Sequence, residues 1–158
     1  MTDNKEIYEG ELVDGKRSGK GKLTWPSGDV YEGDFYDGML HGKGKMTWRD
    51  GTVYTGSFSN DWIAGKGKIV YANGDEYEGD FADGTRSGIG VFKWANGNHY
   101  EGSFANGHRD GKGKMTYNDG LVYEGYYVAG KREGKGKVTY PDGRVEKGIF
   151  VNGKLIKE

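Results

Sequence analysis

A period of 23 residues runs through almost the whole chain and limits the folds that it can adopt. The segment Tyr31 to Val53 (YEGDFYDGMLHGKGKMTWRDGTV) is one copy of the repeating unit, and its tyrosine is taken as repeat position 1. Glycines at positions 3, 8, 12, 14 and 21 account for all 31 glycines of the chain, and only Asp61 interrupts their series. A fixed period of about 20–50 residues is typical of repeat arrays. The position 1 tyrosines are Tyr8, Tyr31, Tyr54, Tyr77, Tyr100 and Tyr123.

The repeat also predicts how the chain is organised. Residues 1–7 form a short leader, residues 8–145 contain six 23-residue repeats, and residues 146–158 form a truncated terminal repeat. In such arrays each unit packs on its neighbours, so the molecule grows in length rather than in core. The apolar fraction of 34% argues against a large compact core. Because glycines and aromatic residues keep one register, the sequence does not suggest disorder.

Each repeat contains two turn signals, as in Asp37-Gly38 and Asp50-Gly51. Asp-Gly and Asn-Gly pairs favour hairpin turns because both residues can adopt positive φ. The turns alternate at spacings of 13 and 10 residues, which leaves room for strands of about 5–7 residues. No segment has the period of a helix. We therefore predict an all-β fold, an elongated, single-layer, twisted antiparallel meander of β-hairpin repeats with about 13 strands.

The alternation along the strands predicts two unlike faces. Positions 1, 3, 5, 12, 14, 16 and 18 place aromatic, aliphatic and glycine residues on one side, called the aromatic face. Positions 2, 4, 13 and 15 place acids and lysines on the other side, called the charged face. Glycine weakens a strand, and its presence often marks the close approach of another group. We expect the ring of a neighbouring strand to lie across these glycines.

The pattern YEGxFxxGxxxGxGxhTWxxGxx, repeated from Tyr8 to Gly153, resembles the MORN repeat (membrane occupation and recognition nexus). The resemblance implies elongated, twisted strips of β-hairpins. It also implies a scaffold that binds a partner helix or peptide or associates through its sheet ends. Some members of this family are attached to lipid kinases or protein methyltransferases. This sequence departs from the pattern at Thr55, Asp61, Ile89, Val91, Glu146 and Lys147.

The composition and the motifs favour no enzyme, no cofactor and no metal site. The GKGK segments lack the GxxxxGK[ST] pattern of a phosphate-binding loop, and the three histidines fall at different repeat positions. A net charge of −1 does not favour nucleic acid as a partner. The chain has no cysteine, no apolar signal segment and no run of the roughly 18–20 apolar residues of a membrane span. We expect a cytoplasmic protein, peripheral at a membrane or at the cytoskeleton.

Three surfaces are candidates for binding. The aromatic face is a groove for a partner if the single layer leaves it open, and packing within the sheet is its alternative role. The lysines of positions 13 and 15 suit anionic lipid, whereas pairing with acids of adjacent strands would only stabilise the sheet and keep it soluble. Positions 9 and 10 are apolar in the second and third repeats, which predicts either a partner-binding patch on the rim or a local cap over the groove. The candidate residues are Trp25, Phe35, Trp48, Phe58, Tyr71, Phe81, Trp94 and Phe104 for the groove, Met39, Leu40, Trp62 and Ile63 for the rim patch, and Lys43, Lys45, Lys66 and Lys68 for lipid.

We expect the chain to be a non-enzymatic protein-interaction scaffold whose aromatic groove receives a partner peptide, helix or protein. A peripheral module that binds anionic phospholipid weakly and an accessory segment of a larger enzyme are the alternatives. The uncovered last strand predicts a homodimer through the sheet ends, which Lys154 and Lys157 would oppose. The missing glycine at Asp61 predicts a turn of different shape in the third repeat.

Overall fold

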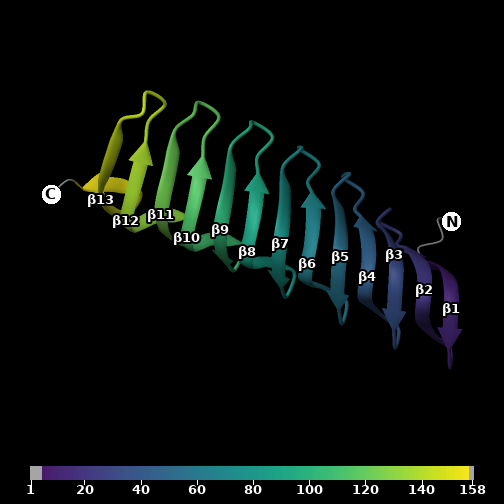
Figure 1. Ribbon diagram of the computed structural model, residues 1–158. Helices are drawn as coiled ribbons and strands as arrows, with labels where there is room; N and C mark the ends of the chain where they lie inside the picture. Colours follow the sequence, from purple (N-terminus) through teal and green to yellow (C-terminus); the bar gives the residue numbers. More distant parts are fainter. Residues whose placement is uncertain (1–4, 157–158) are drawn as a thin grey trace. The chain divides into compact units, whose positions relative to one another are not determined.

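The computed structural model describes residues 5–156, and every regular element in this range is a β-strand. Within it there are 14 strands, where the sequence predicted about 13. The chain divides into two compact units, residues 1–74 with 81–84 and residues 75–80 with 85–158. In each unit the strands are antiparallel and follow one another in sequence order (Figure 1). The described range contains no helix that could cross a membrane.

The first unit holds β1 to β6, the second holds β8 to β14, and β7 (Glu76–Ala82) contributes residues to both. The predicted all-β antiparallel meander of hairpins is confirmed in each unit, while its elongation stays a prediction. The strands of the first unit are β1 (Ile7–Val13), β2 (Lys16–Thr24), β3 (Val30–Tyr36), β4 (Met39–Thr47), β5 (Val53–Ser59) and β6 (Trp62–Val70). Those of the second are β8 (Thr85–Lys93), β9 (His99–Ala105), β10 (His108–Thr116), β11 (Val122–Val128), β12 (Lys131–Thr139), β13 (Val145–Val151) and β14 (Lys154–Ile156).

The second strand of each full repeat is 9 residues long, longer than predicted, because the hairpin contains a bulge. In the β3–β4 hairpin Gly33 pairs with Gly44 and Phe35 pairs with Leu40, so one residue of β3 faces three residues of β4. Gly42 lies in this bulge with a φ of +73°, a conformation that glycine adopts without steric cost. The position 12 glycine is therefore a backbone requirement that the face pattern did not reveal.

An aspartate at position 4 stabilises the bulge in two of the repeats. The Asp34 carboxylate accepts a hydrogen bond from the Lys43 N–H at 2.9 Å, and the Asp80 carboxylate accepts one from the Ile89 N–H at 3.1 Å. The carbonyl of position 4 also accepts a hydrogen bond from the position 1 hydroxyl, as in the 2.6 Å bond from Tyr31 to Asp34. Position 4 thus joins the bulge to the core.

The core of each unit lies on the aromatic face, where position 1 tyrosines alternate with position 5 rings. Tyr31 is fully buried, and its ring meets Phe35 and the position 5 ring of the next repeat edge-to-face, each at a centroid distance of 5.0 Å. The ring also lies across Gly44, where a Cβ would be 2.5 Å from the Tyr31 Cζ. In the second unit a Cβ on Gly136 would be 2.7 Å from the Tyr123 ring. The predicted approach of a ring over the glycines is confirmed.

The turn at Asp61 has the same shape as the equivalent turns, so the prediction of a different shape is wrong. Asp61 has a φ of +73°, close to the +83° of Gly38 at the same repeat position. Its N–H donates to the Leu40 carbonyl at 3.0 Å, as the Gly38 N–H does to the Arg17 carbonyl. The Asp61 carboxylate accepts a further hydrogen bond from the Leu40 N–H at 2.9 Å. This bond helps to offset the strain of a non-glycine residue at positive φ.

The last strand of the described range, β14, pairs with β13 through three residues. Association of two chains through this end stays a prediction. The boundaries of the leader and of the truncated repeat also stay predictions from the sequence. Residues 1–4 of the leader and residues 157–158 of the truncated repeat, which include Lys157, lie outside the described residues.

Candidate functional site

The phenylalanines of the predicted groove are core residues. Their exposed fractions lie between 3% and 6%, so a partner cannot reach them while the sheet stays folded. Phe58, for example, packs edge-to-face against Tyr31 and Tyr54 at centroid distances of 5.0 and 5.1 Å. These rings support the aromatic face from within rather than line a groove. The four residues are Phe35, Phe58, Phe81 and Phe104.

The position 18 rings of the same prediction are half-buried. They are Trp25, Trp48 and Tyr71 in the first unit and Trp94 in the second. Each begins the second turn of its repeat, where, for example, the Trp48 N–H donates to the Thr52 carbonyl at 2.8 Å. Because this turn fixes the backbone while the ring stays partly open, these side chains can meet a partner without unfolding.

In the second unit two further position 18 rings border a small cavity. Tyr117, Tyr140 and Arg132 line this space of about 410 Å³. The Arg132 Nη2 donates to the Tyr117 hydroxyl at 2.7 Å, and the guanidinium carbon lies 5.6 Å from the centre of that ring. The sequence prediction did not include this cavity, although the period placed both tyrosines beside the predicted groove.

Side chains at position 10 cover the aromatic face. In the second unit the Arg109 guanidinium carbon lies 4.9 Å from the centre of the Tyr127 ring and 5.7 Å from that of Trp94. Its Nη2 donates to the Gly130 carbonyl at 3.0 Å. In the first unit Leu40 takes this position and is 5% exposed. A signal was available in the sequence, because every position 10 residue is long: Arg17, Leu40, Ile63, Arg86, Arg109, Arg132 and Leu155.

The predicted rim patch divides between interior and surface. Leu40 is buried, while Met39 and Ile63 are half-buried. Trp62 is 60% exposed, and its ring lies close to the next turn, where a Cβ on Gly84 would be 3.1 Å away. The four side chains therefore do not form one continuous exposed patch, and Trp62 is the member that a partner can reach most easily.

Several lysines of the first unit take part in cross-strand contacts on the charged face. Lys20 forms an ion pair with Asp34, and its hydrogen bond holds the pKa of the Asp34 carboxyl below its usual range. The Lys43 Nζ donates to the Ser57 hydroxyl at 2.7 Å. Such contacts favour the structural role of the lysine rows. The lysines predicted for lipid are all exposed: Lys43, Lys45, Lys66 and Lys68.

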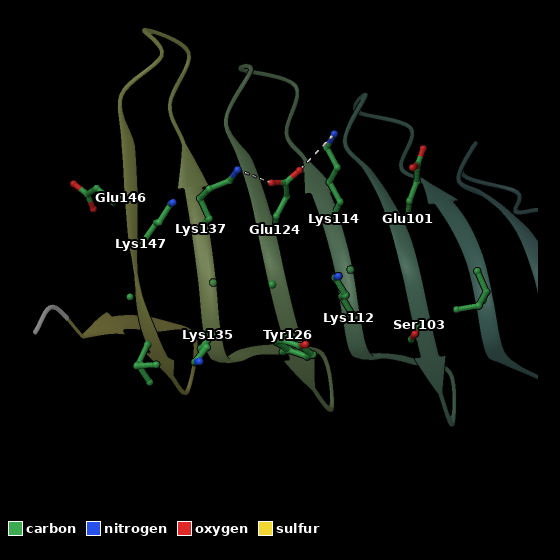
Figure 2. Close-up of a pocket in the computed structure, with 16 residues that line it drawn as sticks. Glu101, Ser103, Lys112, Lys114, Glu124, Tyr126, Lys135, Lys137, Glu146 and Lys147 are labelled. Atoms are coloured by element: carbon green, nitrogen blue, oxygen red, sulfur yellow. Dashed lines mark ion pairs between the residues drawn. The ribbon is translucent and has the colours of Figure 1, made fainter.

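A groove of about 1280 Å³ lies on the charged face of the second unit, where none was predicted. Its floor is backbone, formed by position 3 and position 14 glycines that pair with one another across β10 to β13. Figure 2 shows two rows of side chains along this floor. One row contains Glu101, Lys114, Glu124, Lys137, Lys147 and Glu146, and the other contains Ser103, Lys112, Tyr126 and Lys135.

Only one of these rows has ion pairs that join neighbouring strands. Glu124 lies between Lys137 at 3.1 Å and Lys114 at 3.8 Å (Figure 2). The hydrogen bond from Lys137 lowers the pKa of the Glu124 carboxyl. The spacing of the lysines was evident from the sequence, but the volume between the rows was not, because it depends on the curvature of the strands.

The buried tyrosine hydroxyls act as hydrogen-bond donors. Burial raises the pKa of Tyr54 and that of Tyr100 to about 12. Their hydroxyls donate to the carbonyls of Ser57 at 2.8 Å and Ser103 at 2.9 Å. They therefore stay protonated near neutral pH. Residues 5–156 contain no group of three or more His, Cys, Asp or Glu side chains that could hold a metal ion.

The family model of the MORN repeat matches six consecutive segments of the chain, residues 8–30, 31–53, 54–76, 77–99, 100–122 and 123–143. Comparison with curated protein sequences gives no match. The structure of the SAS-4 (dCPAP) TCP domain of Drosophila melanogaster, in complex with a proline-rich motif of Ana2 (dSTIL), is similar. Its TM-score is 0.54 at 15% identity, over 83% of this chain and 73% of that chain. For the wild-type TCP10 domain of Danio rerio CPAP the TM-score is 0.50 at 21% identity, over 87% of this chain and 65% of that chain. At these identities the likeness concerns the fold alone.

Proposed function

Because the chain belongs to the MORN-repeat family, we propose that it is a non-enzymatic scaffold that binds a partner protein on the aromatic face of its sheets. The observation that carries this proposal is the row of half-buried position 18 rings, which keep part of their surface open beside a fully buried core. Tryptophan and tyrosine offer a large contact area with few rotatable bonds and dominate binding hot spots. The proposed contact residues are Trp25, Trp48 and Tyr71 in the first unit and Trp94 in the second.

A peptide segment is the partner that suits this surface best. Extended and proline-rich segments dock on aromatic side chains at a low cost in conformational entropy. The SAS-4 TCP domain, which has a similar fold, is in complex with a proline-rich motif of Ana2, and this supports a peptide as the first partner class to test. Trp62 is proposed as an additional anchor at the rim because its side chain is 60% exposed.

Affinity capture from a cell lysate tests the proposal. The baits are the wild-type chain, the double variant Trp25→Ala/Trp48→Ala and a control, Lys45→Ala/Lys68→Ala, which changes two exposed residues of the charged face. We expect at least one protein to be captured by the wild type and the control but to be reduced at least tenfold with the tryptophan variant, since a hot-spot ring contributes about 2 kcal/mol or more. Circular dichroism must show that the variant keeps its strands. Equal capture of every protein by all three baits would contradict the proposal.

A cytoplasmic location, peripheral at a membrane or at the cytoskeleton, is part of the same proposal. Fractionation of cells that express the tagged chain tests it. The protein should appear in the cytosol and in fractions that salt releases from membranes or filaments, and recovery from the culture medium alone would contradict it.

A further inference from the structure

We propose that the groove on the charged face of the second unit binds an acidic segment of another protein in the polyproline II conformation, with a carboxylate at every third residue. The groove is a different surface from the aromatic face. The inference rests on the proposed function only in that the partner is a protein.

The first argument is the loss of acids at position 4. In the first unit Asp34 occupies this position and pairs with Lys20. In the second unit the Cα partner of Lys112 is Tyr126 and that of Lys135 is Ile149. As a result, neither Lys112 nor Lys135 has a carboxylate within ion-pairing distance among residues 5–156. Both side chains are exposed, so their charges are available to a ligand.

The second argument is the sign of the charge around the groove. Its lining holds five lysines (112, 114, 135, 137 and 147) and three glutamates (101, 124 and 146). The row with Lys112 and Lys135 contains no acid among its labelled side chains in Figure 2. Lysines therefore predominate in the lining, and a concave surface with an excess of one sign of charge favours ligands of the opposite sign. An acidic ligand therefore fits this groove better than a neutral or basic one.

The third argument is the apolar part of the lining. Tyr126 is 47% exposed and Ile89 is 63% exposed, and both line the groove with Ile149. Burial of such side chains stabilises a complex by roughly 25 cal/mol per Å² of apolar area. A ligand that carries apolar residues between its acidic ones would use both kinds of contact, whereas a small inorganic anion would use only the lysines.

The fourth argument is the spacing of the lysines. Lys112 on β10 and Lys135 on β12 occupy the same position of successive repeats and are separated by two strand spacings, roughly 9.6 Å. A polyproline II helix rises about 3.1 Å per residue with three residues per turn, so every third side chain points the same way after roughly 9.3 Å. In a β-strand, side chains on one face repeat after roughly 6.8 Å. The spacing therefore matches polyproline II.

The two rows of side chains also favour a segment of chain over a lipid surface. An extended segment about one chain wide can lie on the glycine floor between the rows, where it meets Lys112 on one side and Lys114 on the other (Figure 2). A flat membrane would meet only the tips of both rows. It would also approach the carboxylate of Glu124, which already bridges two lysines.

Fluorescence anisotropy of a labelled peptide with five Glu-Pro-Pro triplets, titrated with the full chain, tests the inference. A peptide with the same number of glutamates at every second position is the register control, and a peptide of Lys-Pro-Pro triplets is the charge control. We expect the Glu-Pro-Pro peptide to bind at least tenfold more tightly than either control and to be weakened by salt. Equal affinity for the register control, or no binding at all, would overturn the inference.

The matched variants give the second unit the pairing of acid and lysine that Asp34 and Lys20 have in the first. In Tyr126→Asp/Ile149→Asp each new carboxylate faces a lysine across the sheet, as Asp34 faces Lys20. We expect this variant to bind the peptide at least tenfold more weakly. Lys131→Ala/Lys154→Ala changes the net charge by the same amount at exposed positions outside the groove lining and should bind like the wild type. If the aspartate variant does not fold, Lys112→Ala/Lys135→Ala tests the same two charges.

Two further outcomes separate this inference from its alternatives. If vesicles containing phosphatidylserine bind more tightly than the peptide and the aspartate variant abolishes that binding, the groove is a lipid site and the inference is wrong. The aromatic-face variant Trp25→Ala/Trp48→Ala should keep its affinity for the peptide. If no acidic peptide binds to the wild type while the tryptophan variant still loses captured proteins, the inference fails and the proposed function stands. If the acidic peptide binds and the tryptophan variant captures every protein as the wild type does, the proposed function fails and the inference stands.

Discussion

The charged faces of the two units differ although their backbones follow the same repeat. In the first unit Asp34 pairs with Lys20 and accepts a hydrogen bond from the Lys43 N–H, so acid and lysine neutralise each other. In the second unit the lysines remain, but the position 4 acids are absent from the last repeats, and a groove of about 1280 Å³ lies between the side chains. The replacements at position 4 there are Ser103, Tyr126 and Ile149.

The aromatic faces carry two kinds of cover at position 10. Leu40 in the first unit is buried, whereas arginines such as Arg109 in the second unit stack on rings and donate to a turn carbonyl. Arginine also takes this position at Arg17, in the first repeat of the first unit, where it lies over the Tyr8 ring. The comparison separates two kinds of repeat position. Glycine and tyrosine positions are required by the backbone and the core, and positions 4 and 10 can change without changing the strands. Variation at positions 4 and 10 is therefore expected to change the charged face and the cover of the aromatic face while the sheet stays the same.

The largest expected effect concerns a feature that both units share, the packing of a tyrosine ring over a glycine. Gly67→Ala in the first unit and Gly136→Ala in the second should each lower the free energy of unfolding by about 3 kcal/mol or more. The new Cβ would lie 2.5 Å from the Tyr54 ring or 2.7 Å from the Tyr123 ring. Urea denaturation measures both. The exposed neighbours supply controls, Lys66→Ala and Lys135→Ala, which should change stability little. If the alanine variant of one unit keeps its stability while that of the other loses it, the close approach of the tyrosine ring to the glycine is not common to both units.

Both units should unfold over the same range of high pH. The folded state holds the protons of Tyr54 and Tyr100 up to a pKa of about 12, whereas an unfolded tyrosine has a pKa of about 10. This contribution to stability is complete below about pH 10 and is lost as the pH rises toward about 12. Tyrosinate absorbance and circular dichroism should therefore change together. Ionisation of all tyrosines near pH 10 with intact strands would contradict the burial of these hydroxyls.

Replacement of the arginine cover should have a moderate effect. Arg109→Leu removes the stacking on Tyr127 and the hydrogen bond to the Gly130 carbonyl, but leucine occupies this position in the first unit. We expect a loss of about 1–2 kcal/mol in thermal unfolding. Lys131→Leu, at an exposed position of the same strand, is the control. No loss of stability would mean that the two kinds of cover are interchangeable.

The smallest expected effect is a gain in stability. Tyr127 takes a position that is phenylalanine in most repeats, it is 2% exposed, and its hydroxyl has no hydrogen-bond partner among the described residues. Tyr127→Phe removes a buried unsatisfied group and should stabilise the chain by about 1 kcal/mol. The control Tyr123→Phe should destabilise it instead, because the Tyr123 hydroxyl donates to the Tyr126 carbonyl at 2.8 Å. A lower melting temperature for Tyr127→Phe would reveal a partner for that hydroxyl.

The sequence by itself determined the features that depend on spacing along the chain. The 23-residue period and the paired turn signals specify antiparallel hairpins, and the alternation of residue types specifies two unlike faces. The ring of Tyr31 over Gly44 also followed from the sequence, because a residue without a Cβ at a fixed position of a strand indicates a close neighbour. These inferences are reliable because the relevant partners lie at fixed distances in the sequence.

Only the tertiary structure decided which side chains are accessible. The bulge at Gly42 depends on a positive φ that a glycine permits but does not require. The burial of Phe58, the cover formed by Arg109 and the groove between Lys112 and Lys114 arise where side chains of neighbouring strands meet. Burial and concavity depend on how strands curve and on what each neighbour contributes. The spacing of residues within a single repeat predicts neither burial nor concavity, so the accessibility of side chains could be determined only from the tertiary structure.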